Sequence, residues 1–114
     1  MYSKPRFIQG VFPFEGGGLF HPFALRDASY TVPDGHRAQL IYFRGGNSLD
    51  EMIYLALMRD GLPMRYFPIG AKSDTHVALA VVEDLLAGTR VEVFVAAPET
   101  ARGTVVLDIG LMEI

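Results

Sequence analysis

The sequence predicts an all-β domain in which two antiparallel sheets pack face to face. From about Ala28 to the C-terminus, short runs of β-branched and aromatic residues alternate with turn signals, which is typical of strands. The connections between these runs are short, and this favours antiparallel pairing because parallel neighbours need long crossovers. Most runs have one apolar face, as strands of two packed sheets do. We therefore expect an antiparallel β-sandwich of immunoglobulin-like or jelly-roll type, with about seven strands.

Composition limits the class of protein. The chain has 114 residues and is 50% hydrophobic, which suits a single domain with a substantial core. It contains no cysteine, so disulfides and thiolate metal sites are excluded and a reducing compartment is favoured. The N-terminus lacks the apolar run of a signal sequence, and no stretch reaches the length of a membrane span. We expect a soluble, cytoplasmic protein that does not bind membranes.

The charge pattern argues against nucleic-acid binding. The 10 basic and 13 acidic residues give a formal net charge of −3. The basic residues are scattered along the chain, whereas a nucleic-acid interface needs a basic stripe that displaces counterions from phosphates.

Residues 1–25 differ from the rest of the chain. Their phenylalanines are mixed with glycines and prolines that interrupt both helical and strand periodicity, yet the segment is too apolar for a solvated tail. We predict an extended arm over residues 1–25, followed by a sandwich domain over residues 26–114. The rings expected to lie on the domain itself or on a neighbouring subunit belong to Phe7, Phe12, Phe14, Phe20 and Phe23.

The expected strands follow from alternation and from the turns between them. The Pro33-Asp34-Gly35 turn separates the first two, because proline presets φ and glycine supplies the left-handed position. Residues 75–82 are apolar on both faces, which predicts a central strand buried on both sides. The expected strands are residues 29–32, 36–43, 52–59, 62–69, 75–82, 89–96 and 103–114.

Residues 49–58 are compatible with two structures. Ser48 and Glu51 form a capping-box pattern, and Gly61 follows as a C-terminal stop, so a helix and an α+β fold are the alternative. Asp60-Gly61 is also a strong hairpin signal between two apolar runs. A two-residue turn would pair Arg59 with Leu62, and Met58 with Pro63, where the missing N–H of proline is not needed. This agreement favours the hairpin.

Patterns for catalysis, metals and cofactors are weak. The three histidines, at positions 21, 36 and 76, have no metal-ligand spacing, and no serine lies in a nucleophile elbow. Adjacent carboxylates on a strand point to opposite faces, so the paired acids do not suggest acid–base chemistry. We expect no metal site, no cofactor and no catalytic residue, and we favour a protein that is not an enzyme.

One polar site can be proposed from the sequence. Arg44, Asn47 and Asp50 lie on an expected corner between strands, and Arg65 and His76 could lie nearby. Together these residues could bind a carbohydrate or an anionic metabolite, since arginine recognises carboxylate and phosphate groups by paired hydrogen bonds. The alternative is that Arg44 only pairs with an acidic residue of the same corner.

Asp108 interrupts the apolar run of residues 103–114. By alternation it shares a face with Val106 and Gly110, and we expect this face to be solvated. On a buried face, Asp108 would need an arginine partner.

The leading functional hypothesis is a non-catalytic binding or assembly module. The apolar arm exceeds what a small sandwich needs, so we expect self-association or a protein partner. The alternatives are a small-ligand binding protein at the polar site, or an accessory subunit of an enzyme.

Overall fold

The computed structural model describes residues 3–114 and confirms the all-β prediction. The strands form two antiparallel sheets. Residues 53–59 form a strand, so the alternative of a helix over residues 49–58 is wrong. Within the described residues no helix could cross a membrane. The strands are β1 Lys4–Glu15, β2 Phe23–Thr31, β3 Ala38–Asn47, β4 Ile53–Arg59, β5 Leu62–Ile69, β6 Asp74–Ala78, β7 Asp84–Leu85, β8 Arg90–Ala96 and β9 Arg102–Glu113.

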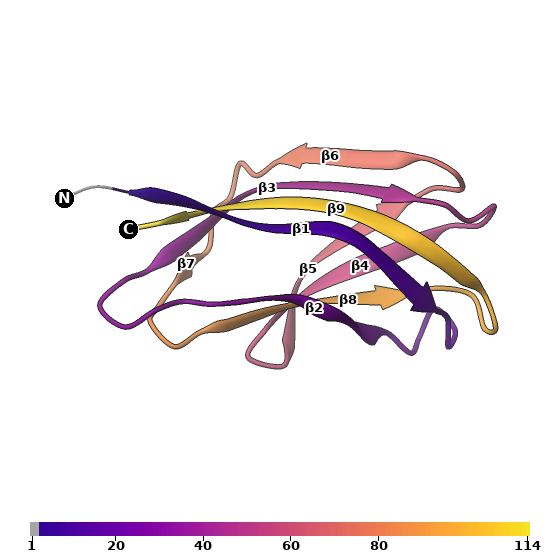
Figure 1. Ribbon diagram of the computed structural model, residues 1–114, viewed down its shortest axis with the longest axis horizontal. Coiled ribbons are helices and arrows are strands. Elements are labelled where there is room, and N and C mark those ends of the chain that lie inside the picture. The colour runs from indigo at the N-terminus through magenta and orange to yellow at the C-terminus, as the bar shows by residue number, and fades with distance from the viewer. Residues whose placement is uncertain (1–2) are drawn as a thin grey trace.

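Each sheet combines strands that are far apart in the sequence. Sheet A has the order β1-β9-β3-β6, and the short strand β7 pairs with the start of β3. Sheet B has the order β2-β8-β4-β5. In Figure 1, the strands of sheet A run along the long axis of a molecule that measures 46 × 23 × 22 Å, and β2 and β8 lie below them. The chain changes sheets at most of its connections, so both sheets cover one core.

The core lies between the inner faces of the sheets. Alternation turns every second residue of the central strands inward. Phe43 of β3 and Phe67 of β5 stack in parallel, with ring centroids 4.0 Å apart. Gly45 leaves room for this pair, because a Cβ at that position would lie 2.8 Å from the Phe43 ring. The buried inner residues of β4, β8 and β9 are Ile53, Leu55, Leu57, Val91, Val93, Val95, Val105, Leu107, Ile109 and Leu111.

The N-terminal segment differs from the predicted arm. Lys4–Glu15 is a strand of the sandwich that pairs with β9 along its full length, and residues 23–25 already belong to β2. Ile8 and Phe14 are buried in the core. β1 is the edge strand of sheet A, where prolines such as Pro5 and Pro13 are tolerated because one side of the backbone has no partner. Because these prolines interrupt the alternation of the segment, its periodicity did not predict a strand.

Residues 75–82 do not form the predicted central strand. Only Asp74–Ala78 is a strand, β6, and it lies at the edge of sheet A, where it pairs with β3 alone. The following residues leave the sheet, and the side chain of Val81 is 67% exposed. Residues 75–82 are mostly apolar, but this composition does not correspond to a strand that is buried on both sides.

The hairpin after β4 has the predicted register at its turn. Arg59 pairs with Leu62 and Met58 with Pro63. An irregularity then follows, so that Arg65 lies opposite Leu57 and faces the inner side.

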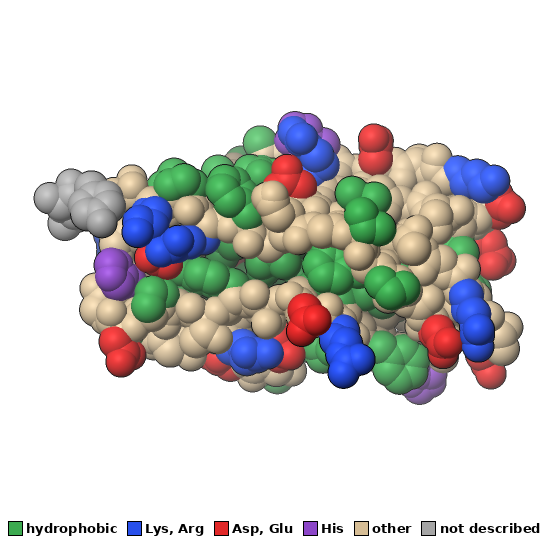
Figure 2. All heavy atoms as spheres, in the orientation of Figure 1, with side chains coloured by type: hydrophobic (Ala, Val, Ile, Leu, Met, Phe, Trp, Pro, Cys, Tyr) green, Lys and Arg blue, Asp and Glu red, His purple; other side chains and the backbone are tan. Residues whose placement is uncertain are grey.

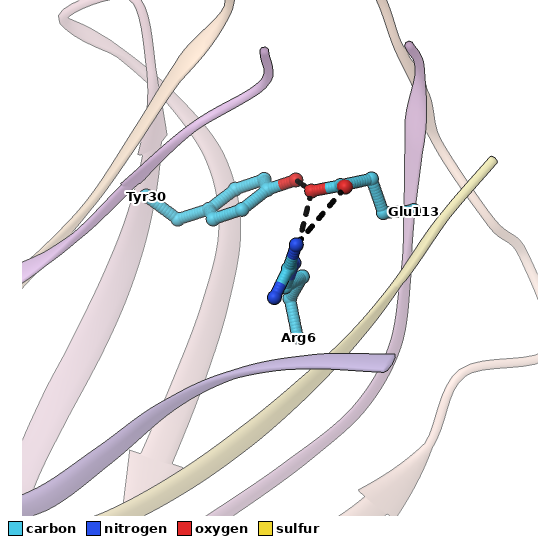
Figure 3. Close-up of polar contacts among 3 residues, drawn as sticks. All are labelled: Arg6, Tyr30 and Glu113. Carbon is cyan, nitrogen blue, oxygen red and sulfur yellow. Dashed lines mark hydrogen bonds and ion pairs between the residues drawn. The ribbon is translucent and has the colours of Figure 1, made fainter. Parts of the chain in front are cut away.

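One end of the core is closed by a polar contact between the sheets (Figure 3). Arg6 of β1 and Tyr30 of β2 both point at the carboxylate of Glu113 on β9. The Tyr30 hydroxyl donates to Oε2 over 2.5 Å, and the Arg6 guanidinium donates to both oxygens over 3.2 and 3.4 Å. Glu113 is buried, with 5% exposure. Because β2 belongs to sheet B and the other two strands to sheet A, the contact ties the sheets together.

This contact shifts the titration of both acidic groups. The hydrogen bonds from Tyr30 and from Arg6 hold the pKa of Glu113 below its ordinary value of 4.5. Burial and the same hydrogen bond raise the pKa of Tyr30 above 10.0. A carboxyl with a lowered pKa in the folded state stabilises the fold above its ordinary pKa, and this stabilisation is lost as the pH falls.

We expect Tyr30→Phe to make the protein less resistant to acid. Without the hydroxyl, the pKa of Glu113 moves back toward its ordinary value, so the midpoint of acid unfolding shifts to higher pH. Circular dichroism from about pH 6 down to about pH 2 measures this midpoint. Tyr66→Phe is the matched control, because Tyr66 is exposed and its hydroxyl has no hydrogen-bond partner within residues 3–114. Equal midpoints for the two variants would contradict the prediction.

Candidate functional site

The outer face of sheet A carries a row of four polar side chains, one from each main strand. The strand register places Gln9 opposite Asp108, Asp108 opposite Arg44, and Arg44 opposite His76. These side chains point away from the core, because the residues next to them on β3 and β9 are buried on the inner face. We call these four residues the polar row. It crosses the whole width of the sheet.

Tyr42 contacts three members of this row, Asp108, Arg44 and His76. Its hydroxyl donates to Oδ1 of Asp108 over 2.8 Å, while Nη1 of Arg44 lies 3.9 Å from the other carboxylate oxygen. The Arg44 guanidinium is 6.0 Å from the centroid of the Tyr42 ring, within the range of a cation–π contact. The His76 ring meets the same tyrosine edge-on, with centroids 6.3 Å apart. Tyr42 is thus the centre of the cluster.

The ring of Tyr42 lies over the backbone of β9. Tyr42 pairs with Gly110, and a Cβ at Gly110 would lie only 2.1 Å from Cε2 of the ring. Glycine is therefore required for the ring to occupy this position. The ring is half-buried, and burial, followed by the hydrogen bond to Asp108, raises the pKa of Tyr42. The hydroxyl consequently stays protonated and continues to donate to Asp108.

Apolar side chains border the polar row on both sides. On one side of the row Phe7 lies opposite Gly110, and on the other side Val11 lies opposite Val106. Phe7, Val11 and Val106 are 51%, 66% and 53% exposed. In Figure 2, hydrophobic side chains are spread over the region where Figure 1 draws β1 and β9, with charged groups between them. The outer face of sheet A therefore offers apolar contact area next to charged and hydrogen-bonding groups.

The structure brings together two of the five residues proposed as ligand contacts. Arg44 and His76 are neighbours in the polar row, and Arg44 pairs with Asp108 rather than with an acid of its own corner. Asp108 is on the partly solvated outer face, as expected. Tyr42 and Gln9 were not proposed from the sequence. Gln9 reaches this face only through the pairing of β1 with β9 and of β9 with β3, whereas Tyr42 lies two residues before Arg44 on β3 and shares its face by alternation.

Asn47 and Asp50 lie elsewhere. β3 continues through Asn47, so the corner begins after it and not at Arg44. The buried Asn47 amide donates to the carbonyls of Glu51 and Gly70 over 2.9 and 3.1 Å, and its oxygen accepts from the N–H of Leu49. Asp50 is exposed, and its carboxylate lies 3.2 Å from the Lys72 ammonium. Asn47 thus holds the corner together and is not available to a ligand.

Arg65 also has a structural role. Its Nη2 donates to the Glu83 carboxylate over 2.6 Å and to the Val81 carbonyl over 2.9 Å. These contacts fasten edge strand β5 of sheet B to the segment that follows β6 of sheet A.

The five phenylalanines of the predicted arm do not share one surface. Phe14 is buried and Phe12 is half-buried against the core. Phe7, Phe20 and Phe23 are exposed. Among residues 3–114, no three histidine, aspartate or glutamate side chains are grouped as metal ligands would be.

The sequence matches no family model and no curated protein. Among solved structures, the chain is similar to the CBM36-1 domain of a multidomain xylanase from the hindgut metagenome of Trinervitermes trinervoides. The similarity covers 96% of each chain, with a TM-score of 0.51 and 16% sequence identity. At this identity the similarity concerns the fold, which is a two-sheet β-sandwich in both proteins.

We expect Asn47→Ala to destabilise the protein by about 1–3 kcal/mol, because two carbonyls and an N–H lose the partner that the buried amide supplies. Asp50→Ala, at the same corner, removes only an exposed ion pair and should cost less than about 1 kcal/mol. Urea unfolding of both variants measures the difference. Similar losses for the two would show that Asn47 does not hold the corner.

Proposed function

We propose that this domain is a non-catalytic binding module that holds a carbohydrate on the outer face of sheet A. The observation that supports this most directly is the position of Tyr42, whose ring lies over Gly110 beside the polar row. An aromatic ring held against a sheet gives an amphipathic ligand a rigid contact surface at little cost in conformational entropy.

The neighbouring groups suit the two kinds of surface that a sugar presents. A sugar ring has a C–H face, which can pack on the aromatic ring, and hydroxyl groups around its edge. Arg44 supplies donors, Asp108 supplies acceptors, and the Gln9 amide supplies both. Arg44 and Asp108 are 56% and 35% exposed at the side chain, so both are accessible to hydroxyl groups.

The structural similarity is consistent with this proposal. The similar solved domain is described as a CBM, a carbohydrate-binding module, within a xylanase. Because only 16% of the residues are identical, the ligand class proposed for this chain depends on the chemistry of its own sheet face.

A binding role fits the polar row better than a catalytic one. Glycoside hydrolysis requires two carboxyl groups on either side of the bond that is cleaved. The polar row has one carboxylate, Asp108, and that group already accepts from Tyr42 and pairs with Arg44.

We expect Tyr42→Ala to weaken carbohydrate binding by about tenfold or more, because the ring supplies the main apolar contact. Affinity electrophoresis in gels that contain soluble plant polysaccharides identifies the ligand, and isothermal titration with its oligosaccharides gives the affinity. Tyr66→Ala is the matched control, since Tyr66 is an exposed tyrosine at 59% on sheet B. If the two variants bind with equal affinity, or if the wild-type protein binds no polysaccharide, the proposal is wrong.

A second candidate function is self-association along β1. β1 is a twelve-residue edge strand, and the exposed Phe7 and Val11 continue onto Val106 of the neighbouring strand. Unpaired edge strands beside apolar residues are common sites of strand addition.

Two further expectations from the sequence, a cytoplasmic location and a role as an accessory subunit of an enzyme, stay predictions.

For self-association, we expect Val11→Lys to convert an oligomer to a monomer, because it places a charge among the exposed apolar residues of β1. Val81→Lys is the control, since Val81 is equally exposed at 67% but lies outside the sheet. Size-exclusion chromatography with light scattering measures the mass. A wild-type protein that is monomeric at high concentration would rule out this candidate and leave the carbohydrate proposal intact.

A further inference from the structure

We infer that the cleft between β1 and β2 is a second binding site, for a small organic anion that has an apolar body and a carboxylate. The cleft has a volume of about 630 Å³ and lies between the end of β1 and the start of β2, with the start of β9 at its border. Its volume lies within the range of roughly 300–1,000 Å³ that is usual for small-molecule sites.

The interior of the cleft is apolar. Phe14, Leu25 and Val95, which line it, are 7%, 5% and 2% exposed and belong to the core. Phe23, on its wall, is 53% exposed and offers an accessible aromatic ring. In Figure 2, hydrophobic side chains are visible along the middle of the face, where Figure 1 draws the gap between β1 and β2. An apolar group that entered the cleft would cover the exposed Phe23 ring and lie against the edge of the core.

The cleft is shaped by an irregularity in β2. Ala24 pairs with Phe94 and Ser29 with Glu92, so that residues 25–28 of β2 lie opposite a single residue of β8. Within this bulge, Asp27 has a φ of 67°, a conformation that is uncommon for residues other than glycine. Bulges redirect side chains, and local strain of this kind is often retained at binding sites. The residue before Asp27 is Arg26, which lines the cleft.

Two arginines line the cleft, and one of them has no acidic partner. Arg102 pairs with Glu15 at 3.3 Å. The side chain of Arg26 is exposed and forms no ion pair or hydrogen bond with any residue in the range 3–114. The cleft therefore combines an apolar interior with one uncompensated guanidinium. A carboxylate on an apolar body matches both features, because the guanidinium binds it through two parallel hydrogen bonds.

This site is separate from the polar row. The cleft lies at the margin of the core between the ends of the two sheets, whereas the polar row lies on the outer face of sheet A. Failure of the carbohydrate proposal would therefore leave this inference untouched.

The test uses the whole protein and octanoate as the probe. Amide chemical shifts in ¹H–¹⁵N NMR spectra, followed during a titration, should change at Gly16, Ala24, Arg26 and Gly103, and should not change in the polar row. Octanol, which has the apolar body without the charge, should bind at least about tenfold more weakly. Added salt should weaken octanoate binding, because the pair is accessible to solvent.

Two variants and a control separate the contributions. Arg26→Gln should lower the affinity for octanoate about tenfold and leave that for octanol unchanged. Phe23→Ala should weaken both ligands. Arg59→Gln is the control, because Arg59 also has no ion pair within residues 3–114 and lies at the opposite end of sheet B. Shift changes outside the cleft, equal affinities for octanoate and octanol, or an equal effect of Arg26→Gln and Arg59→Gln would each overturn the inference.

Discussion

Most features of this domain depend on the pairing of β9 with a neighbour on each side. β1 covers one edge of β9 along its full length, and β3 covers the other. Alternation along β9 then produces two surfaces at once. Its inward residues form a large part of the core, and its outward residues include Asp108 and Gly110, which position the candidate carbohydrate site. A shift of one residue in either pairing would exchange these surfaces, so the core and the site are determined by the same register.

The margins of the sandwich are held by charged contacts between the sheets. At one end, Glu113 on β9 accepts from Tyr30 of sheet B, and on the side of β5, Arg65 contacts Glu83 after β6. Such contacts are suited to the margins, because at least one partner there keeps access to water, as the Arg6 guanidinium does beside the buried Glu113. The cleft lies at the opposite end of β1 and β2 from the Glu113 contact, and there the edge of the core faces a ligand.

The sequence was informative about strands and less so about their partners. Alternation and turn residues located seven of the eight strands after β1 in outline, although β6 is shorter than expected and β7 was not predicted. The Asp60-Gly61 turn fixed the local register correctly. β1 was missed because its prolines and Gly10 interrupt the pattern, although an edge strand tolerates them. Arg44 and His76 were chosen as polar residues. Arg44 lies beside Tyr42 by alternation along β3, but His76 and Asp108 reach this tyrosine only because β6 and β9 pair with β3. Periodicity within a single run contains no information about such pairing.

The close approach of Tyr42 to Gly110 has a consequence for comparing this chain with others. Many proteins can share a two-sheet sandwich without sharing a ligand, because the core needs only apolar residues of suitable size. The ring position needs more: a tyrosine on one strand and, directly across from it, a residue without a side chain. The joint presence of these two residues is therefore a marker in an alignment. It separates chains that keep this surface from chains that keep only the architecture.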